Sequence, residues 1–396
     1  MDYERDTFLK STLRSLWLTI GLLLAATVSH ATTVTFAGLS YSGDSKSIPA
    51  RFPYSLKLEK TLAARGNPLN KQLAAKLAAD KPLHFDLNQQ GLTSLKGQDQ
   101  AIVATLLITG ETVSAERFGN VAKLMTQVRA QAMFFDFKNM TVLRAYPLSF
   151  AYLDLIDHYP SEREMQDRFA ALYYGEQDKP GILQRFADIM HEAAVPDQVP
   201  RFLQVAKVRI GDDARKALPP ELTRTPGTAE TWAADLFAEN LSSKTGVPLL
   251  PYTKGYAIGN TLSMRVSEGD VFMLKLPEAD YAITLDIPKL RRITSGEVAA
   301  GTSYIYGAYA HVNIQEPVSG KHYLDADFKN GEIKLVPASQ DTIDDFPAYH
   351  EAIKGLFAKL ADNLAGNRND WLKSSTSASD IDKQIQSTQQ LLKACK

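Results

Sequence analysis

Two stretches of the chain show the same order of hydrophobic and polar patterns. Each starts with an apolar run rich in β-branched residues, which predicts a strand, and continues with apolar positions spaced as on one face of a helix. Each then alternates between apolar and polar residues over several strand-length segments. The predicted strands are 34–39, 101–113, 121–137 and 142–146 in the first stretch, and 205–210, 280–287, 303–314, 322–328 and 332–336 in the second.

Helical patterns lie between and after these strands. They cover 53–65, 69–79 and much of the polar segment 151–191 in the first stretch, and 228–243 and 349–364 in the second. Ser161 and Glu164 have the spacing of a capping box, which satisfies backbone N–H groups at the start of a helix. In the helix 228–243, we expect Trp232, Leu236 and Phe237 to face inward.

Two short polar sequences predict turns between strands. Lys138-Asn139-Met140 can reverse the chain in the first stretch, and Asn330-Gly331 is typical of a two-residue hairpin in the second. An EF-hand-like calcium loop at 325–332 is disfavoured, because Lys329 stands where an oxygen ligand is required. We therefore expect a hairpin there rather than a metal site.

The patterns predict an α/β or α+β chain with two similar domains, each an antiparallel-rich mixed sheet with flanking helices. Two prolines within residues 195–200 indicate a linker between domains, so that the predicted domains are 32–198 and 199–366. Asp136-Phe137-Lys138-Asn139 recurs as Asp327-Phe328-Lys329-Asn330, in keeping with a tandem duplication. Residues 367–396 predict a polar linker and a short helix that is loosely docked or disordered.

The amino terminus has the layout of a signal peptide. An apolar run at 16–26 follows a charged stretch and leads into Ser29-His30-Ala31, which predicts cleavage after Ala31. The run is shorter than the roughly 20 apolar residues that span a bilayer, so a retained membrane anchor is the weaker interpretation. We expect a periplasmic protein with no stable membrane anchor after residues 1–31 are removed.

Charge and cysteine content narrow the classes further. The 44 Lys and Arg residues nearly balance the 45 Asp and Glu residues, so we expect neither nucleic acid nor anionic lipid to be a favoured partner. Cys395 is the only cysteine, which excludes an intramolecular disulfide. It either pairs between molecules or is an incidental thiol.

Gly43-Asp44-Ser45 is the strongest sign of catalysis in the sequence. GDS-type esterases place a nucleophilic serine in such a turn after a strand, but Ser45 would need a histidine base that a carboxylate orients. We expect no complete triad. The mature chain's histidines, at 84, 158, 191, 311, 322 and 350, have no paired metal-ligand spacing, so we also expect no metal and no cofactor.

In both stretches a helix precedes a strand that begins with similar residues, Asp99-Gln100-Ala101-Ile102 and Asp280-Tyr281-Ala282-Ile283, and a hairpin, a returning strand and a helix follow. This order resembles the α/β unit of the TolB amino-terminal domain and of the secretion-channel protein CsgG. Ser319-Gly320-Lys321 and Asn330-Gly331-Glu332-Ile333 approximate the glycine turn of that unit, whereas Asn139-Met140-Thr141-Val142 lacks the glycine. The resemblance implies a role in envelope assembly or secretion and transfers no catalytic residue.

These observations favour a non-enzymatic periplasmic binding or scaffolding protein in cell-envelope assembly or secretion. Its partner would be an envelope protein or a second copy of the chain, bound at a sheet edge or an aromatic face. A periplasmic GDS-type ester hydrolase that uses Ser45 is the alternative. A small ligand bound between the two domains is a third possibility.

Overall fold

The computed structural model describes residues 32–43, 45–79, 82–95, 101–118, 121–176, 179–195, 200–252, 257–258, 261–266, 269–338, 343–367 and 369–396. The predicted signal peptide and the middle of the predicted boundary, residues 196–199, lie outside this part of the chain.

The first unit is built around three long antiparallel strands, β3 (Ile102–Phe118), β4 (Val121–Asp136) and β5 (Thr141–Ile156). β1 (Thr33–Ser42) pairs parallel with β3, and the short β2 (Asp86–Asn88) pairs parallel with β1. One face is covered by helices, which bury apolar side chains of alternate strand positions. These helices are α2 (Ile48–Arg51), α3 (Pro53–Ala64), α4 (Leu69–Ala78), α5 (Glu162–Tyr174) and α6 (Ile182–Glu192).

Local signals in this unit are mostly confirmed, with one exception. The predicted capping box is present, since the Ser161 hydroxyl accepts from the Glu164 N–H and the Glu164 carboxylate accepts from the Ser161 N–H. The residues 137–140 form the predicted turn, where Met140 adopts a φ of 50°. The helical prediction from 151 is wrong for its first residues, because β5 continues to Ile156.

Short elements complete the unit: η1 (Leu92–Leu95), β6 (Gly175–Glu176) and β7 (Lys179–Pro180).

A hairpin from later in the sequence closes the other face of this sheet. β10 (Thr261–Val266) pairs with β1, β11 (Val271–Lys275) pairs with β5, and the short β9 (Ala257–Ile258) lies beside β10. Its buried side chains Leu262, Met264 and Leu274 join a separate core with residues of β3, β4 and β5. The predicted boundary at 198/199 would place this hairpin in the second domain, although it packs on the first sheet. The division into two folding domains stays a prediction.

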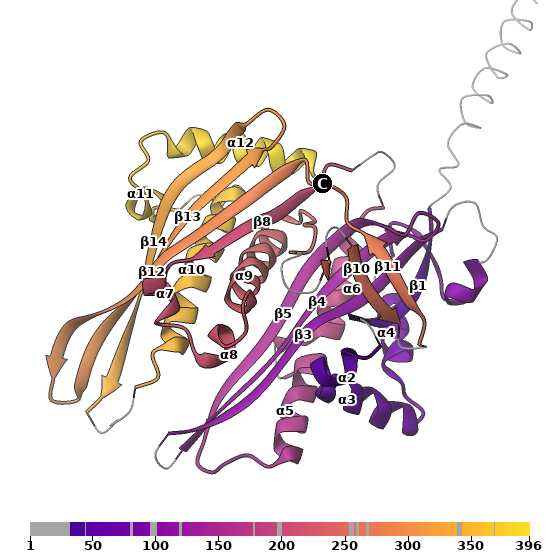
Figure 1. Cartoon of the computed structure of the whole chain (residues 1–396), viewed down its shortest axis with the longest axis horizontal. Coiled ribbons are helices and arrows are strands. Elements are labelled where there is room, and N and C mark those ends of the chain that lie inside the picture. The colour runs from indigo at the N-terminus through magenta and orange to yellow at the C-terminus, as the bar shows by residue number, and fades with distance from the viewer. Residues whose placement is uncertain are drawn as a thin grey trace, which may run out of the picture.

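The second unit repeats the arrangement of the first. β8 (Leu203–Ile210) pairs parallel with β12 (Tyr281–Val298), and β12, β13 (Gly301–Glu316) and β14 (Lys321–Pro337) form an antiparallel meander. The helices are the short α7 (Asp212–Arg215) and α8 (Pro220–Thr223) and the long α9 (Thr228–Thr245) and α10 (Phe346–Leu364). The predicted fold class, two similar mixed sheets with flanking helices, is confirmed (Figure 1).

The predicted hairpin at Asn330-Gly331 is wrong. Both residues lie inside β14 and pair with Ala308 and Gly307 of β13, while the chain reverses at 317–320. The Asn330 amide is buried, donates to the Ala352 carbonyl of α10 at 2.9 Å and accepts from the Lys359 Nζ at 2.8 Å. These tertiary bonds outweigh the local turn preference of the Asn-Gly pair.

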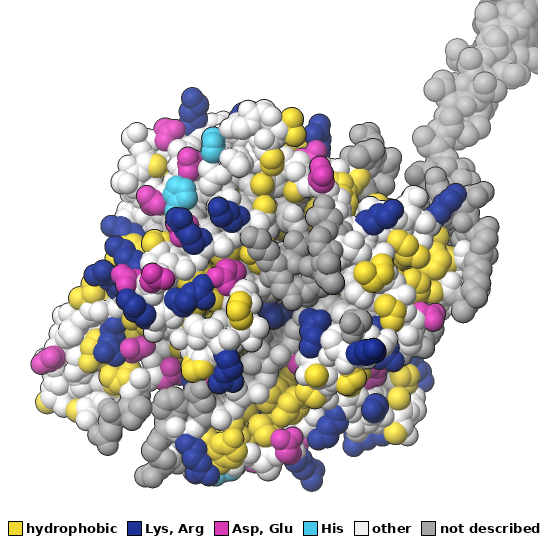
Figure 2. Space-filling view, in the orientation of Figure 1, with side chains coloured by type: hydrophobic (Ala, Val, Ile, Leu, Met, Phe, Trp, Pro, Cys, Tyr) yellow, Lys and Arg dark blue, Asp and Glu magenta, His cyan; other side chains and the backbone are white. Residues whose placement is uncertain are grey.

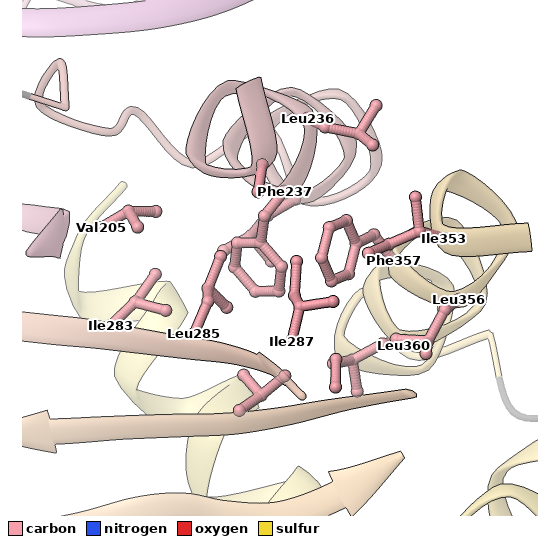
Figure 3. Close-up of a cluster of buried hydrophobic side chains, with 14 of the residues drawn as sticks. Val205, Leu236, Phe237, Ile283, Leu285, Ile287, Ile353, Leu356, Phe357 and Leu360 are labelled. Carbon is pink, nitrogen blue, oxygen red and sulfur yellow. The ribbon is translucent and has the colours of Figure 1, made fainter. Parts of the chain in front are cut away.

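α9 and α10 lie between the two sheets (Figure 1). In Figure 3, Phe237 of α9 and Phe357 of α10 point toward Leu285 and Ile287 of β12, whereas Leu236 points away from that strand. α9 is buried on nearly all sides, including polar residues such as Asp235 and Asn240, as expected for a helix that lies between two layers. The inward orientation predicted for Trp232, Leu236 and Phe237 is confirmed by their burial.

The carboxyl-terminal tail is an integral part of the second unit, which corrects the expectation of loose docking. α11 (Trp371–Ser375) and α12 (Ile381–Ala394) pack on β14, and Ile385, Leu391 and Leu392 are buried in the second core. The side chains of Gln384 and Thr388 bond the backbone of Asp325 and Tyr323 on the edge of β14. This packing was difficult to predict from the sequence because the apolar positions of α12 are few and well spaced.

Candidate functional site

A cavity of about 240 Å³ lies between the first sheet and the helices α9 and α10. One wall is the face of β4 and β5 that is turned away from α5 and α6, and the opposite wall is formed by one side of α9 and the start of α10. Its principal lining residues are Met125, Gln127, Arg129, Ser149, Ala151, Leu153, Trp232, Asp235, Leu236, Glu239, Phe346, His350 and Lys354.

Helical spacing places the α9 residues of the cavity on one side of that helix. Trp232, Asp235, Leu236 and Glu239 are separated by three or four positions, which brings side chains onto a common face. On the strands, Arg129 lies opposite Ser149, as cross-strand neighbours do. The two halves of the chain thus contribute one wall each.

Three aromatic rings form the apolar end of the cavity. The ring centroids of Trp232, Phe346 and His350 lie 5.9 to 6.1 Å from one another, in tilted arrangements. Such rings offer a large apolar surface at little entropic cost. His350 Nδ1 is buried and has no hydrogen-bond partner within the described part of the chain.

Two ion pairs join the first sheet to the helices at the cavity. Arg129 Nη1 lies 2.7 Å from Asp235 Oδ2, and the side chains are only 20% and 12% exposed. Lys123 Nζ lies 2.5 Å from Asp344 Oδ2, just before α10. Because each pair is largely withdrawn from water, loss of one partner leaves a poorly solvated charge.

Near neutral pH, His350 is neutral, and Glu239 is protonated in about half of the molecules. Burial raises the pKa of Glu239 to about 7, although nearby Lys354 and hydrogen bonds from Ser149 lower it. Burial also lowers the pKa of His350 to about 4, and Lys354 adds to this effect. The cavity therefore combines an apolar end with two groups that can donate and accept hydrogen bonds.

An exposed apolar surface extends from the cavity along β5. Leu153 and Leu155 follow Ala151 at alternate positions on the same face and are 46% and 73% exposed. Figure 2 shows hydrophobic side chains in a band along this part of the first sheet. Exposed apolar surface next to a cavity is a feature of binding sites.

Ser45 is the candidate nucleophile of the esterase interpretation. Ser45 is exposed in the turn between β1 and α2, and Asp44 lies outside the described residues. Asp188 and His191 of α6 have the Asp-x-x-His spacing of such esterases. Within the described ranges, however, Ser45 makes no hydrogen bond to a histidine, and His191 Nδ1 is buried without a partner.

The histidines and the carboxylates of the second sheet form surface contacts. Asp325 and Asp327 stand on the flat strand β14 rather than in a loop, and both lie 3.0 Å from the ring nitrogens of His311. No cluster of ligands suited to a metal ion occurs among the residues that the structure describes.

Cys395 is buried in the second core. Burial raises the pKa of its thiol to about 12, so the thiol is protonated at neutral pH. A disulfide to another molecule would first require this buried thiol to become exposed.

No helix in the described ranges is both long enough and apolar enough to span a bilayer.

The chain matches no protein-family model and no curated protein. Among solved structures, it is similar to a DUF330-family protein of Xanthomonas campestris, at 13% identity over 44% of this chain and 88% of that chain, with a TM-score of 0.23. A homologue of a neuraminyllactose-binding hemagglutinin from Helicobacter pylori gives 10% identity, 50% and 95% coverage and a TM-score of 0.25. A minor lipoprotein of Acinetobacter baumannii gives 7% identity, 44% and 96% coverage and a TM-score of 0.20. At these scores the likenesses carry no functional conclusion.

Proposed function

We propose that this chain is a non-enzymatic binding protein of the periplasm that serves cell-envelope assembly or secretion, and that its ligand site is the cavity between the first sheet and the helices α9 and α10. The observation that supports it is the composition of this cavity, in which the rings of Trp232 and Phe346 adjoin Glu239 and His350. Ligand pockets between structural units characteristically combine apolar walls with a few polar groups.

The chemistry of the lining selects a small amphipathic ligand. Its apolar body would lie against the aromatic rings, and its polar head would bond Glu239, His350 or Lys354. A volume of about 240 Å³ is below the roughly 300–1,000 Å³ that is typical of ligand pockets, which favours a small ligand. The paired charges Arg129 and Asp235 hold the two walls together.

Filling the cavity tests this proposal. Native mass spectrometry of protein purified from the periplasm should show a bound small molecule, and Ala151→Phe should remove it because the new ring occupies the cavity. Ala63→Phe, at an exposed position of α3, is the matched control and should retain the molecule. Equal retention by both variants, or a wild-type protein free of any ligand, would contradict the assignment of this cavity.

The envelope partner is the second part of the proposal, and the exposed apolar surface of β5 supports it. A photo-crosslinking residue in place of Leu155 should capture one envelope protein or a second copy of the chain in intact cells. The same residue at the exposed position Lys57 of α3 is the control and should not. The intact mass of the purified protein should show that it begins at Thr32, whereas retention of residues 1–31 in a membrane fraction would refute the periplasmic location.

A further inference from the structure

A second cavity, of about 430 Å³, lies where α6, β5 and the end of α9 meet. Four cationic side chains line it: Arg144 of β5, Arg185 of α6, Lys244 of α9 and Lys396. Among the described lining residues, Glu192 has the only acidic side chain. This cavity is separate from the proposed ligand site, with which it shares no lining residue.

Arg144 is the unusual member of this group. Arg144 is only 9% exposed, and its Nε atom is buried without a hydrogen-bond partner. Among the residues that the structure describes, nothing forms an ion pair or a side-chain hydrogen bond with either Arg144 or Arg185. Burying a guanidinium without a partner costs several kcal/mol of folding free energy, which is why buried arginines are ordinarily paired.

The other two cations have a partial structural explanation. Lys244 Nζ lies 3.0 Å from Asp362 of α10, and a lysine in the last turn of α9 also offsets the partial negative charge of the helix end. Lys396 lies against Gly246 at the same helix end. Neither explanation extends to Arg144 or Arg185, which sit on other elements.

We propose that this basic cavity binds the phosphate group of a ligand. Guanidinium groups match the geometry of phosphate oxygens and can bond two of them at once. The hydroxyl-bearing residues Ser242 and Thr245 also line the cavity, so hydroxyl groups border the cations. A phosphate here would neutralise two buried or half-buried charges that otherwise have no partner.

Titration with inorganic phosphate at low ionic strength tests the proposal. The wild-type protein should bind one phosphate, and Arg144→Gln should weaken binding by about tenfold or more, since charge-assisted hydrogen bonds contribute roughly 1.5–3 kcal/mol each. Arg163→Gln, at an exposed position of α5, is the control and should bind like the wild type. Equal affinity of Arg144→Gln and the wild type, or no binding by the wild type, would overturn the proposal.

Two further measurements separate binding from folding and identify the source of the phosphate. Without phosphate, Arg144→Gln should melt at or above the wild-type temperature because it loses an unpartnered charge; if it does not fold, Arg185→Gln carries the same test. Phosphatidylglycerol vesicles that bind the wild type, but not Arg144→Gln, identify a lipid headgroup. Binding of inorganic phosphate without vesicle binding identifies a soluble phosphate ligand. Ala151→Phe should leave phosphate binding unchanged, so failure of this site is distinguishable from failure of the proposed ligand cavity.

Discussion

Replacing Glu239 with glutamine should stabilise the protein above pH 7 and change little below pH 5. The carboxyl group of Glu239 has a pKa of about 7 in the folded protein, against an ordinary value of 4.5. Between these values the folded state retains a proton that the unfolded state has released, so the free energy of unfolding falls as the pH rises. Above pH 7 the loss is complete, because the carboxylate is ionised in both states.

The size of the effect follows from the pKa difference. Each unit corresponds to about 1.4 kcal/mol, so the ionised carboxylate lowers the free energy of unfolding by about 3 kcal/mol. Glutamine has nearly the same shape, can still accept a hydrogen bond from Ser149, and carries no charge. It therefore avoids this loss at every pH.

Urea denaturation of the wild type and Glu239→Gln at pH 5, 6, 7 and 8 measures the difference in free energy of unfolding. His350 works in the opposite direction, since its depressed pKa removes stability as the pH falls from 6.5 towards 4, but this contribution is common to both proteins. Glu278→Gln, in the exposed loop after β11, is the control. A difference between Glu239→Gln and the wild type that is the same at all four pH values would refute the reasoning.

Three other experiments test the packing. Arg129→Met should lower the free energy of unfolding, measured in urea, by about 2–3 kcal/mol, because Asp235 is left buried without its ion-pair partner. Adding Asp235→Leu should restore most of the loss, and no recovery would contradict the paired role. Ile385→Ala in α12 should cost about 2–4 kcal/mol and Lys383→Ala almost nothing, whereas equal small costs would mean that the tail is loosely docked. Leu262→Ala in β10 should lower the melting temperature of the first unit, despite its position after residue 199, and an unchanged melting curve would contradict the closure of that unit by β10 and β11.

Local sequence signals predicted an element correctly where residues within that element determine its structure. The capping box at Ser161 and the three inward side chains of α9 are of this kind. The polar character of 151–191 as a whole suggested a helix from residue 151, although the last residues of β5 alternate in exposure as in a strand. The Asn-Gly pair at 330 suggested a turn, because the bonds that hold it in β14 come from α10.

The long-range parts of the fold could not be predicted in this way. β10 is short, and its partner in β1 lies more than two hundred residues earlier, so nothing in its own sequence indicates the pairing. The cavity depends on residues as distant as Arg129 and Asp235, whose contact exists only once both units have packed. The sequence left open a ligand between the two domains, but it offered no means of finding the residues.

The cavity beside Trp232 is the proposed ligand site, and ester hydrolysis by Ser45 is the alternative function. In a chain that begins at Thr32 and carries Trp371→Phe, Trp232 is the only tryptophan and lines the cavity. Titration with the amphipathic anionic probe 8-anilinonaphthalene-1-sulfonate should quench its emission with a saturable response of one probe per chain. Ala151→Phe should abolish that response, and p-nitrophenyl acetate should not be turned over. An unresponsive Trp232, together with ester turnover that Ser45→Ala removes, would contradict the account and favour the hydrolase.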